Sequence, residues 1–126
     1  MPEPAVLRTV LLVDDETDVR DITALLLKRM GFEVLTAEGV EDALAIARSQ
    51  KEIHLLVTDL SLTSAGKGGE ALADSVAQLW PQAGVIFISG TSEYEISPER
   101  MGPRRRFLGK PFSIEDLRRV TAEVLA

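Results

Sequence analysis

Short apolar runs alternate along the chain with longer stretches in which apolar residues recur every three or four positions. The short runs have the length of strands, and the longer stretches have the spacing of one helix face. Strands are predicted at residues 9–13, 32–36, 53–57, 84–88 and 106–108, and helices at 16–30, 40–49, 69–80 and after Ser113. Strands that alternate with helices favour parallel pairing, right-handed crossovers and a sheet covered on both faces.

The helix at 16–30 is expected to bury one apolar stripe and to end at Gly31. The stripe consists of Val19, Ile22, Leu25, Leu26 and Met30. The helix at 40–49 is expected to turn Ala43, Leu44, Ile46 and Ala47 inward.

The last helix has a capping signal at its start. Ser113 is a favourable N-cap, and Asp116 occupies the position three residues later that completes a capping box. Between residues 91 and 105 the pattern predicts only a short or irregular helix, because Pro98, Gly102 and Pro103 interrupt it.

Composition narrows the class of protein. The chain has 126 residues, 45% of them hydrophobic, which suits one domain with a real core. It has no cysteine and a single histidine, His54, which excludes a disulfide framework, a thiolate metal site and a histidine-rich site. A net charge of -6 argues against non-specific nucleic-acid binding. The start lacks the features of a signal peptide, and no apolar run is long enough for a membrane helix. We therefore expect a cytoplasmic protein.

Polar residues gather where the predicted strands end. They are Asp14, Asp15 and Glu16 after the first strand, Asp59 after the third, Ser89 and Gly90 after the fourth, and Lys110 with Pro111 after the fifth. Each one alone is typical of a helix cap, a turn or a solvated side chain. In an open parallel sheet, however, ligands bind beyond the carboxyl ends of the strands, and all of these residues fall on that edge.

Three aspartate carboxylates, a hydroxyl and an ammonium at one edge indicate a specific chemistry. Carboxylates packed together need a cation among them or shifted pKa values. All-oxygen ligands favour Mg²⁺, Mn²⁺ or Ca²⁺ over zinc, and Mg²⁺ held by one or two carboxylates leaves coordination positions for phosphate oxygens. A lysine supplies a point charge for a phosphoryl group, and an aspartate can form an acyl phosphate. The set predicts a magnesium-dependent aspartyl-phosphate site.

Four ordered segments carry a family resemblance: VLLVDDE at 10–16, LVTDL at 56–60, VIFISG at 85–90 and FLGKPF at 107–112. From Val10 to Leu125 the chain resembles a CheY-like receiver domain of two-component response regulators. The resemblance implies an α/β flavodoxin-like fold, a doubly wound five-stranded parallel sheet in the order 2-1-3-4-5. It also implies a single receiver domain over residues 1–126, with its core at about 8–126.

The resemblance further implies a role for each site residue. Asp59 is the phosphoacceptor, and it receives its phosphoryl group from a sensor histidine kinase or a histidine phosphotransfer protein. Asp15 ligates Mg²⁺ directly, Asp14 acts largely through metal-bound water, and Asp59 and the backbone carbonyl of Ser61 complete the ligands. Lys110 pairs with Asp59 and later with the phosphoryl group. Ser89 and Phe107 move as the switch. The Lys110–Pro111 bond is cis. Ser61 and Thr91 flank the path of attacking water, so we expect them to tune the lifetime of the phosphorylated state.

The loop after Asp59 departs from the family pattern. Many receivers have a Pro-Gly turn there, whereas this chain has a longer loop that ends in Gly66, Lys67, Gly68 and Gly69. A phosphate-binding glycine loop is one interpretation, although the full nucleotide-loop motif is absent. A flexible turn before the next helix is the favoured one.

Three functions remain open at this stage. The first is a phospho-accepting signalling module with an unknown output partner, either as a stand-alone regulator or as the receiver segment of a hybrid sensor histidine kinase. The second is a pseudo-receiver that binds without being phosphorylated, which the intact acidic set argues against. The third is a phosphoaspartate hydrolase. Such an enzyme needs a second aspartate two residues after the first, where this chain has Ser61. A signalling domain, not an enzyme, is therefore expected.

Overall fold

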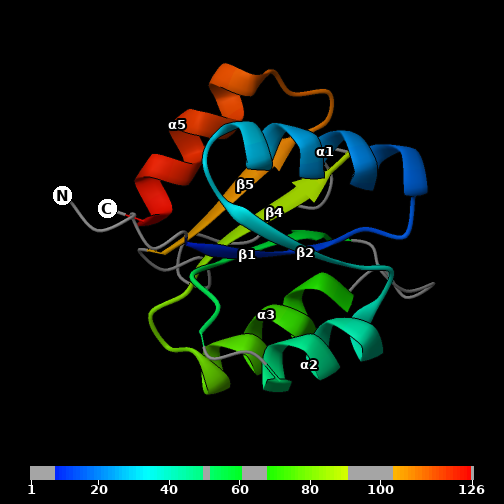
Figure 1. Ribbon diagram of the computed structural model, residues 1–126, viewed down its shortest axis with the longest axis vertical. Helices are drawn as coiled ribbons and strands as arrows, with labels where there is room; N and C mark the ends of the chain where they lie inside the picture. Colours follow the sequence, from blue (N-terminus) through cyan, green and yellow to red (C-terminus); the bar gives the residue numbers. More distant parts are fainter. Residues whose placement is uncertain (1–7, 50–51, 61–67, 91–103, 126) are drawn as a thin grey trace, which may run out of the picture.

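The computed structural model describes residues 8–49, 52–60, 68–90 and 104–125. Its strands are β1 Thr9–Val13, β2 Glu33–Ala37, β3 Leu55–Asp59, β4 Gly84–Ser89 and β5 Arg105–Gly109. Its helices are α1 Thr17–Arg29, α2 Val40–Ser49, α3 Gly68–Leu79 and α5 Ile114–Leu125. The strands form one parallel sheet in the order β2-β1-β3-β4-β5 (Figure 1). The predicted fold class and strand order are confirmed.

The sheet separates two layers of helices. Helices α1 and α5 cover one face, and α2 and α3 cover the other (Figure 1). Because neighbouring side chains of a strand point to opposite faces, β1 supplies Val10 and Leu12 to one core and Leu11 and Val13 to the other. All residues of β1, β3 and β4 are buried, as continuous apolar runs in a two-sided sheet require.

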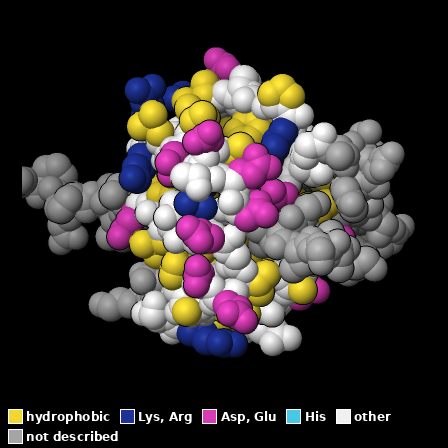
Figure 2. Space-filling view, turned by 90° about the vertical axis from the view of Figure 1, so that its right-hand side faces the viewer, with side chains coloured by type: hydrophobic (Ala, Val, Ile, Leu, Met, Phe, Trp, Pro, Cys, Tyr) yellow, Lys and Arg dark blue, Asp and Glu magenta, His cyan; other side chains and the backbone are white. Residues whose placement is uncertain are grey.

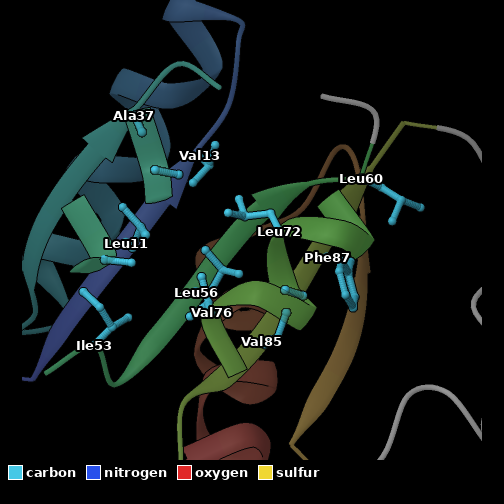
Figure 3. Close-up of a cluster of buried hydrophobic side chains, with 13 residues drawn as sticks. Leu11, Val13, Ala37, Ile53, Leu56, Leu60, Leu72, Val76, Val85 and Phe87 are labelled. Atoms are coloured by element: carbon cyan, nitrogen blue, oxygen red, sulfur yellow. The ribbon is translucent and has the colours of Figure 1, made fainter. Parts of the chain in front are cut away.

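The core under α2 and α3 reaches the edge at which the polar residues lie. Leu60 and Leu72 pack in this cluster together with Phe87 of β4 (Figure 3). Phe107 of β5 is partly buried against the same cluster. The residue next to Asp59 is therefore held by packed side chains, and this gives the site a rigid base.

The helix ends match their sequence signals. Gly31 has φ 97°, and it follows the C-cap Met30 of α1. Its amide donates to the Lys28 carbonyl while the Phe32 amide donates to Leu27, the pair of bonds that defines a Schellman motif. At the start of α5, the Ser113 hydroxyl accepts from the Asp116 amide, and the Asp116 carboxylate accepts from the Ser113 amide. The predicted capping box is confirmed.

The predicted inner stripe of α1 is partly wrong. Ile22 and Leu25 are 62% and 50% exposed, whereas Thr23, Ala24 and Leu27 are buried. The helix carries apolar residues around more than half of its circumference, so periodicity alone could not select the face that meets the sheet. Residues 91–103, where an irregular helix was expected, lie outside the described part of the chain.

The third strand lies two residues later than predicted, at Leu55–Asp59 instead of 53–57. Ile53 is buried in the core before the strand begins, which explains why the apolar run started early. His54 follows it and is structural, as expected, because its Nδ1 accepts a 2.9 Å hydrogen bond from the Thr9 amide. Trp80 also packs, and its indole Nε1 donates to the Ala47 carbonyl.

A candidate phosphoryl and metal site at the strand ends

The parallel register brings the predicted polar residues to one edge of the sheet. Asp14 directly follows β1, Asp59 ends β3, Ser89 ends β4 and Lys110 directly follows β5. Figure 2 views the molecule from the side on which β1 runs into α1, and Asp and Glu side chains gather across the middle of this face. The amide of Lys110 donates to the Ser89 carbonyl at 2.8 Å, which ties two of these strand ends together.

Three carboxylates form a compact cluster. Asp14, Asp15 and Asp59 each offer a carboxylate oxygen, and these oxygens lie within 4.8 Å of one another. Asp14 and Asp59 are buried, at 2% and 7% exposure, while Asp15 is exposed. The cluster therefore joins two buried acids to one at the protein surface.

Asp14 is held by all of its polar groups. Its amide donates to the Ala37 carbonyl, and its Oδ1 accepts a 2.9 Å hydrogen bond from the Glu16 amide. Burial raises the pKa of the Asp14 carboxyl, and the Glu16 amide and Lys110 only partly offset the rise. The folded protein therefore opposes the ionised form of this side chain unless further positive charge arrives.

In the described part of the chain, Lys110 is the cation in contact with the cluster. Its Nζ lies 3.5 Å from Oδ2 of Asp14 and 3.6 Å from Oδ2 of Asp59. The side chain is 20% exposed, so solvent screens these contacts only partly. The peptide bond between Lys110 and Pro111 is cis, as the family resemblance implied.

The other predicted residues fall into two groups. Ser89 is buried beside Gly109 in the β4–β5 register, and Phe107 lies opposite Phe87. Ser61 and Thr91 lie outside the described residues, so the structure does not place the carbonyl ligand or the expected lifetime-tuning side chains.

Two contacts at this edge were missed by the sequence analysis. Arg20 of α1 donates from Nη1 to the Asp14 carbonyl at 2.8 Å. Gly69 belongs to α3, is buried, and leaves no room for a side chain: a Cβ there would lie 2.5 Å from the Asp59 carbonyl oxygen. The two last glycines of the loop are thus packed helix residues, not part of a flexible turn. No local signal distinguishes Arg20 from a solvated arginine, because its acceptor belongs to another element.

The donor set fits a hard divalent cation. All three candidate ligands are carboxylate oxygens, the type that Mg²⁺ and Mn²⁺ prefer over nitrogen or sulfur. Among the described residues, three carboxylates lie beside the one ammonium of Lys110, so these four groups carry net negative charge when ionised. Both the ligand chemistry and the charge therefore suit Mg²⁺.

The chain thus has an open parallel α/β sheet with an acidic cluster and a lysine at its carboxyl edge. A family model described as response regulator receiver domain matches residues 10–122. The chain belongs to this family, and it is a receiver domain of the two-component type.

Similar proteins include a longer response regulator, of which this chain matches one part, and receivers of about the same length as this chain. A putative NtrX-like response regulator of Rickettsia bellii is 33% identical over 110 residues, which cover 86% of this chain and 23% of the relative. The chain thus spans about a quarter of that protein. The receiver protein CpdR of Brucella abortus is 29% identical over 113 residues, 88% of this chain and 91% of CpdR. The crystal structure of the receiver domain from the hybrid histidine kinase CckA is 34% identical with a TM-score of 0.75, and covers 94% of this chain and 99% of that one.

Within the described ranges, no helix is long and apolar enough to cross a membrane.

Proposed function

We propose that this receiver takes a phosphoryl group on Asp59 from a phosphohistidine of a sensor histidine kinase or a histidine phosphotransfer protein. The observation that carries the proposal is the convergence on Asp59 of two further carboxylates and the Lys110 ammonium. A carboxylate buried to 7% exposure beside a cation is held in one orientation, as a nucleophile requires.

The chemistry is a displacement at phosphorus. A carboxylate oxygen of Asp59 forms the new O–P bond while the N–P bond of the phosphohistidine breaks, and the imidazole leaves with the electron pair of that bond. Lys110, already 3.6 Å from Asp59, offsets the charge that gathers on the phosphoryl oxygens. Asp14, Asp15 and Asp59 would hold a Mg²⁺, which when bound would further neutralise the charge on those oxygens. The Ser61 carbonyl is proposed as the remaining protein ligand.

The switch is proposed to run through Ser89 and Phe107. Ser89 ends the strand next to β3, so its hydroxyl is near enough in the sheet to follow a phosphoryl group on Asp59. Phe107 is only partly buried and lies two residues before the end of β5, where it can enter the space that Ser89 leaves. A ligand shifts such an equilibrium only through contacts that differ between the two states. Ser61 and Thr91 remain proposed determinants of phosphoryl lifetime.

The donor protein is proposed to dock over α1. A groove beside the site is lined by Val19, Ile22, Thr23, Leu26, Gly90, Lys110, Pro111 and Phe112. Lys110 belongs to both the groove and the acidic cluster, so a protein seated there reaches Asp59 directly. The exposed Ile22 supplies the apolar contact that such an interface needs. Ile22→Ser should slow transfer from a purified histidine kinase but leave labelling by acetyl phosphate unchanged. Leu79→Ser, a matched change on α3, should affect neither.

The likeness to the CckA receiver favours a second context for the same chemistry, in which the domain is the receiver segment of a hybrid sensor histidine kinase and not a stand-alone regulator. In both contexts the domain is proposed to signal through an output partner. Residues 1–126 are proposed to act as one receiver domain.

The test is intact mass after incubation with acetyl phosphate and Mg²⁺, with Asp59→Asn as the control. One added phosphoryl mass in the parent alone supports the proposal. No gain in a folded parent, with transfer from a kinase also absent, favours a pseudo-receiver. Continuous release of phosphate without a stable adduct favours a hydrolase.

A further inference from the structure

The Arg20 side chain links a backbone carbonyl of the acidic site to the residue after β2. Its Nη1 donates to the Asp14 carbonyl at 2.8 Å, and its Nη2 lies 3.8 Å from Oε1 of Glu38, the residue that follows β2. The Arg20 side chain is only 12% exposed, so it is largely withdrawn from water. A hydrogen bond from a charged donor in such a place is among the stronger ones in proteins.

The bonded carbonyl belongs to the peptide unit that leads into Asp15. A peptide unit is planar, so fixing the carbonyl of Asp14 also fixes the direction in which the chain enters Asp15. Asp14 is already held by its amide and its Oδ1. Asp15 is exposed, and its orientation depends on the backbone more than on packing.

We propose that Arg20 is a positioning residue of the acidic site: it holds the Asp14–Asp15 peptide so that the two carboxylates face Asp59 before a metal ion arrives. This inference rests on the proposed Mg²⁺ and phosphoryl function.

The opposite role for Arg20 is to neutralise the carboxylates. In that role it would resemble Lys110, whose Nζ contacts carboxylate oxygens of Asp14 and Asp59. The guanidinium of Arg20 is instead directed at a carbonyl and at Glu38. The two roles predict opposite signs. Removing a neutralising cation makes the site more negative and strengthens Mg²⁺ binding, whereas removing an anchor loosens the ligands and weakens it.

The salt bridge to Glu38 contributes little to this effect. The Glu38 side chain is 74% exposed, and ion pairs of this kind are weak. The bond to the Asp14 carbonyl therefore carries the positioning effect, and Glu38→Gln should leave Mg²⁺ affinity within about twofold of the parent.

The experiment measures Mg²⁺ affinity from the rise in melting temperature across a Mg²⁺ titration, beside the free energy of unfolding in EDTA. Arg20→Met should weaken Mg²⁺ binding about tenfold, the range found when groups that orient metal ligands are lost. Arg20→Lys keeps the charge and one donor, so it should recover part of the affinity. Arg48→Met, the same change at an exposed arginine of α2, controls for net charge.

Each outcome decides the proposal. Weaker binding by Arg20→Met with partial recovery in Arg20→Lys supports positioning. Tighter or unchanged binding overturns it, whatever happens to the stability in EDTA. Should Arg20→Met fail to fold, Arg20→Lys and Arg20→Gln give the same comparison. A parent that does not respond to Mg²⁺ contradicts the proposed function itself, a result distinct from a parent that responds and a variant that responds equally.

Discussion

The Lys110 ammonium lies 3.6 Å from the Asp59 carboxylate and, at 3.5 Å, is shared with Asp14. One cation thus serves two buried acids that come from different strands. The third acid, Asp15, adds negative charge that Lys110 does not balance. Lys110 therefore holds two of the acids together, and the three carboxylates are placed so that they could hold a metal ion.

Replacing Lys110 by Met should destabilise the metal-free protein by about 1–3 kcal/mol, because two buried carboxylates lose their cation. Mg²⁺ should then bind more tightly, since the lysine no longer competes for the same oxygens. Urea unfolding in EDTA and in Mg²⁺ measures both effects. Lys110→Arg keeps the charge, so its stability and its Mg²⁺ affinity should stay closer to those of the parent. Equal stability of parent and Lys110→Met in EDTA would show that the cation is not structural.

Replacing Asp14 by Asn should stabilise the metal-free protein at neutral pH. Burial raises the pKa of the Asp14 carboxyl, so the folded state binds this proton more tightly than the unfolded chain does. The stability that this proton contributes is present below about pH 4 and is lost as the pH rises through the raised pKa. Asn keeps the acceptor for the Glu16 amide without the charge.

The same variant should weaken Mg²⁺ binding about 10- to 100-fold. Thermal unfolding in EDTA between pH 4 and pH 8 tests the stability, and a Mg²⁺ titration tests the affinity. A variant less stable than the parent across this range would mean that the carboxylate is needed for the fold.

Gly69→Ala should lower the free energy of unfolding by about 1–3 kcal/mol and slow acetyl phosphate labelling. The added methyl group meets the Asp59 carbonyl oxygen at 2.5 Å and the Leu60 Cα at 2.8 Å, so the backbone that carries the nucleophile must move. Gly109→Ala is the control, because a Cβ at Gly109 has nothing within 4 Å. Unchanged labelling in Gly69→Ala would show that packing at the start of α3 does not determine the geometry of Asp59.

The start of α5 should respond to acid. The hydrogen bond from the Ser113 amide lowers the pKa of the Asp116 carboxyl, so this cap stabilises the fold above about pH 4 and is lost as the pH falls through the lowered pKa. Asp116→Asn should therefore lower stability at pH 7 more than at pH 2.5, measured by urea unfolding. An equal effect at both values would show that the charge of the Asp116 carboxylate does not contribute to the cap.

Sequence patterns located the site because its residues follow strands. The central strands β1, β3 and β4 each contain a continuous apolar run, and parallel pairing brings the strand ends together whatever the details of packing. Asp14, Asp59 and Lys110 could be assembled on that basis before any contact was known. The start of β3 was misplaced by two residues because the buried Ile53 extends the apolar run beyond the hydrogen-bonded ladder.

Side-chain contacts between elements did not follow from the pattern. Periodicity identifies residues that favour burial, but α1 has more apolar positions than the sheet can cover, and Ile22 stays exposed. Its exposure gives the groove beside Lys110 an apolar wall.

The sequence by itself determined which side chains lie at the carboxyl edge of the parallel sheet, namely the acids, the hydroxyl and the lysine that follow or end its strands. Those features depend on local hydrophobic runs and on the few ways in which parallel strands can be connected. Only the tertiary structure decided that Arg20 holds the Asp14 carbonyl and that Gly69 meets the backbone of Asp59. The first contact spans six residues, from α1 back to the loop after β1, and the second joins the start of α3 to the end of β3. Both depend on how a helix packs against the end of a strand, which the hydrophobic pattern does not specify.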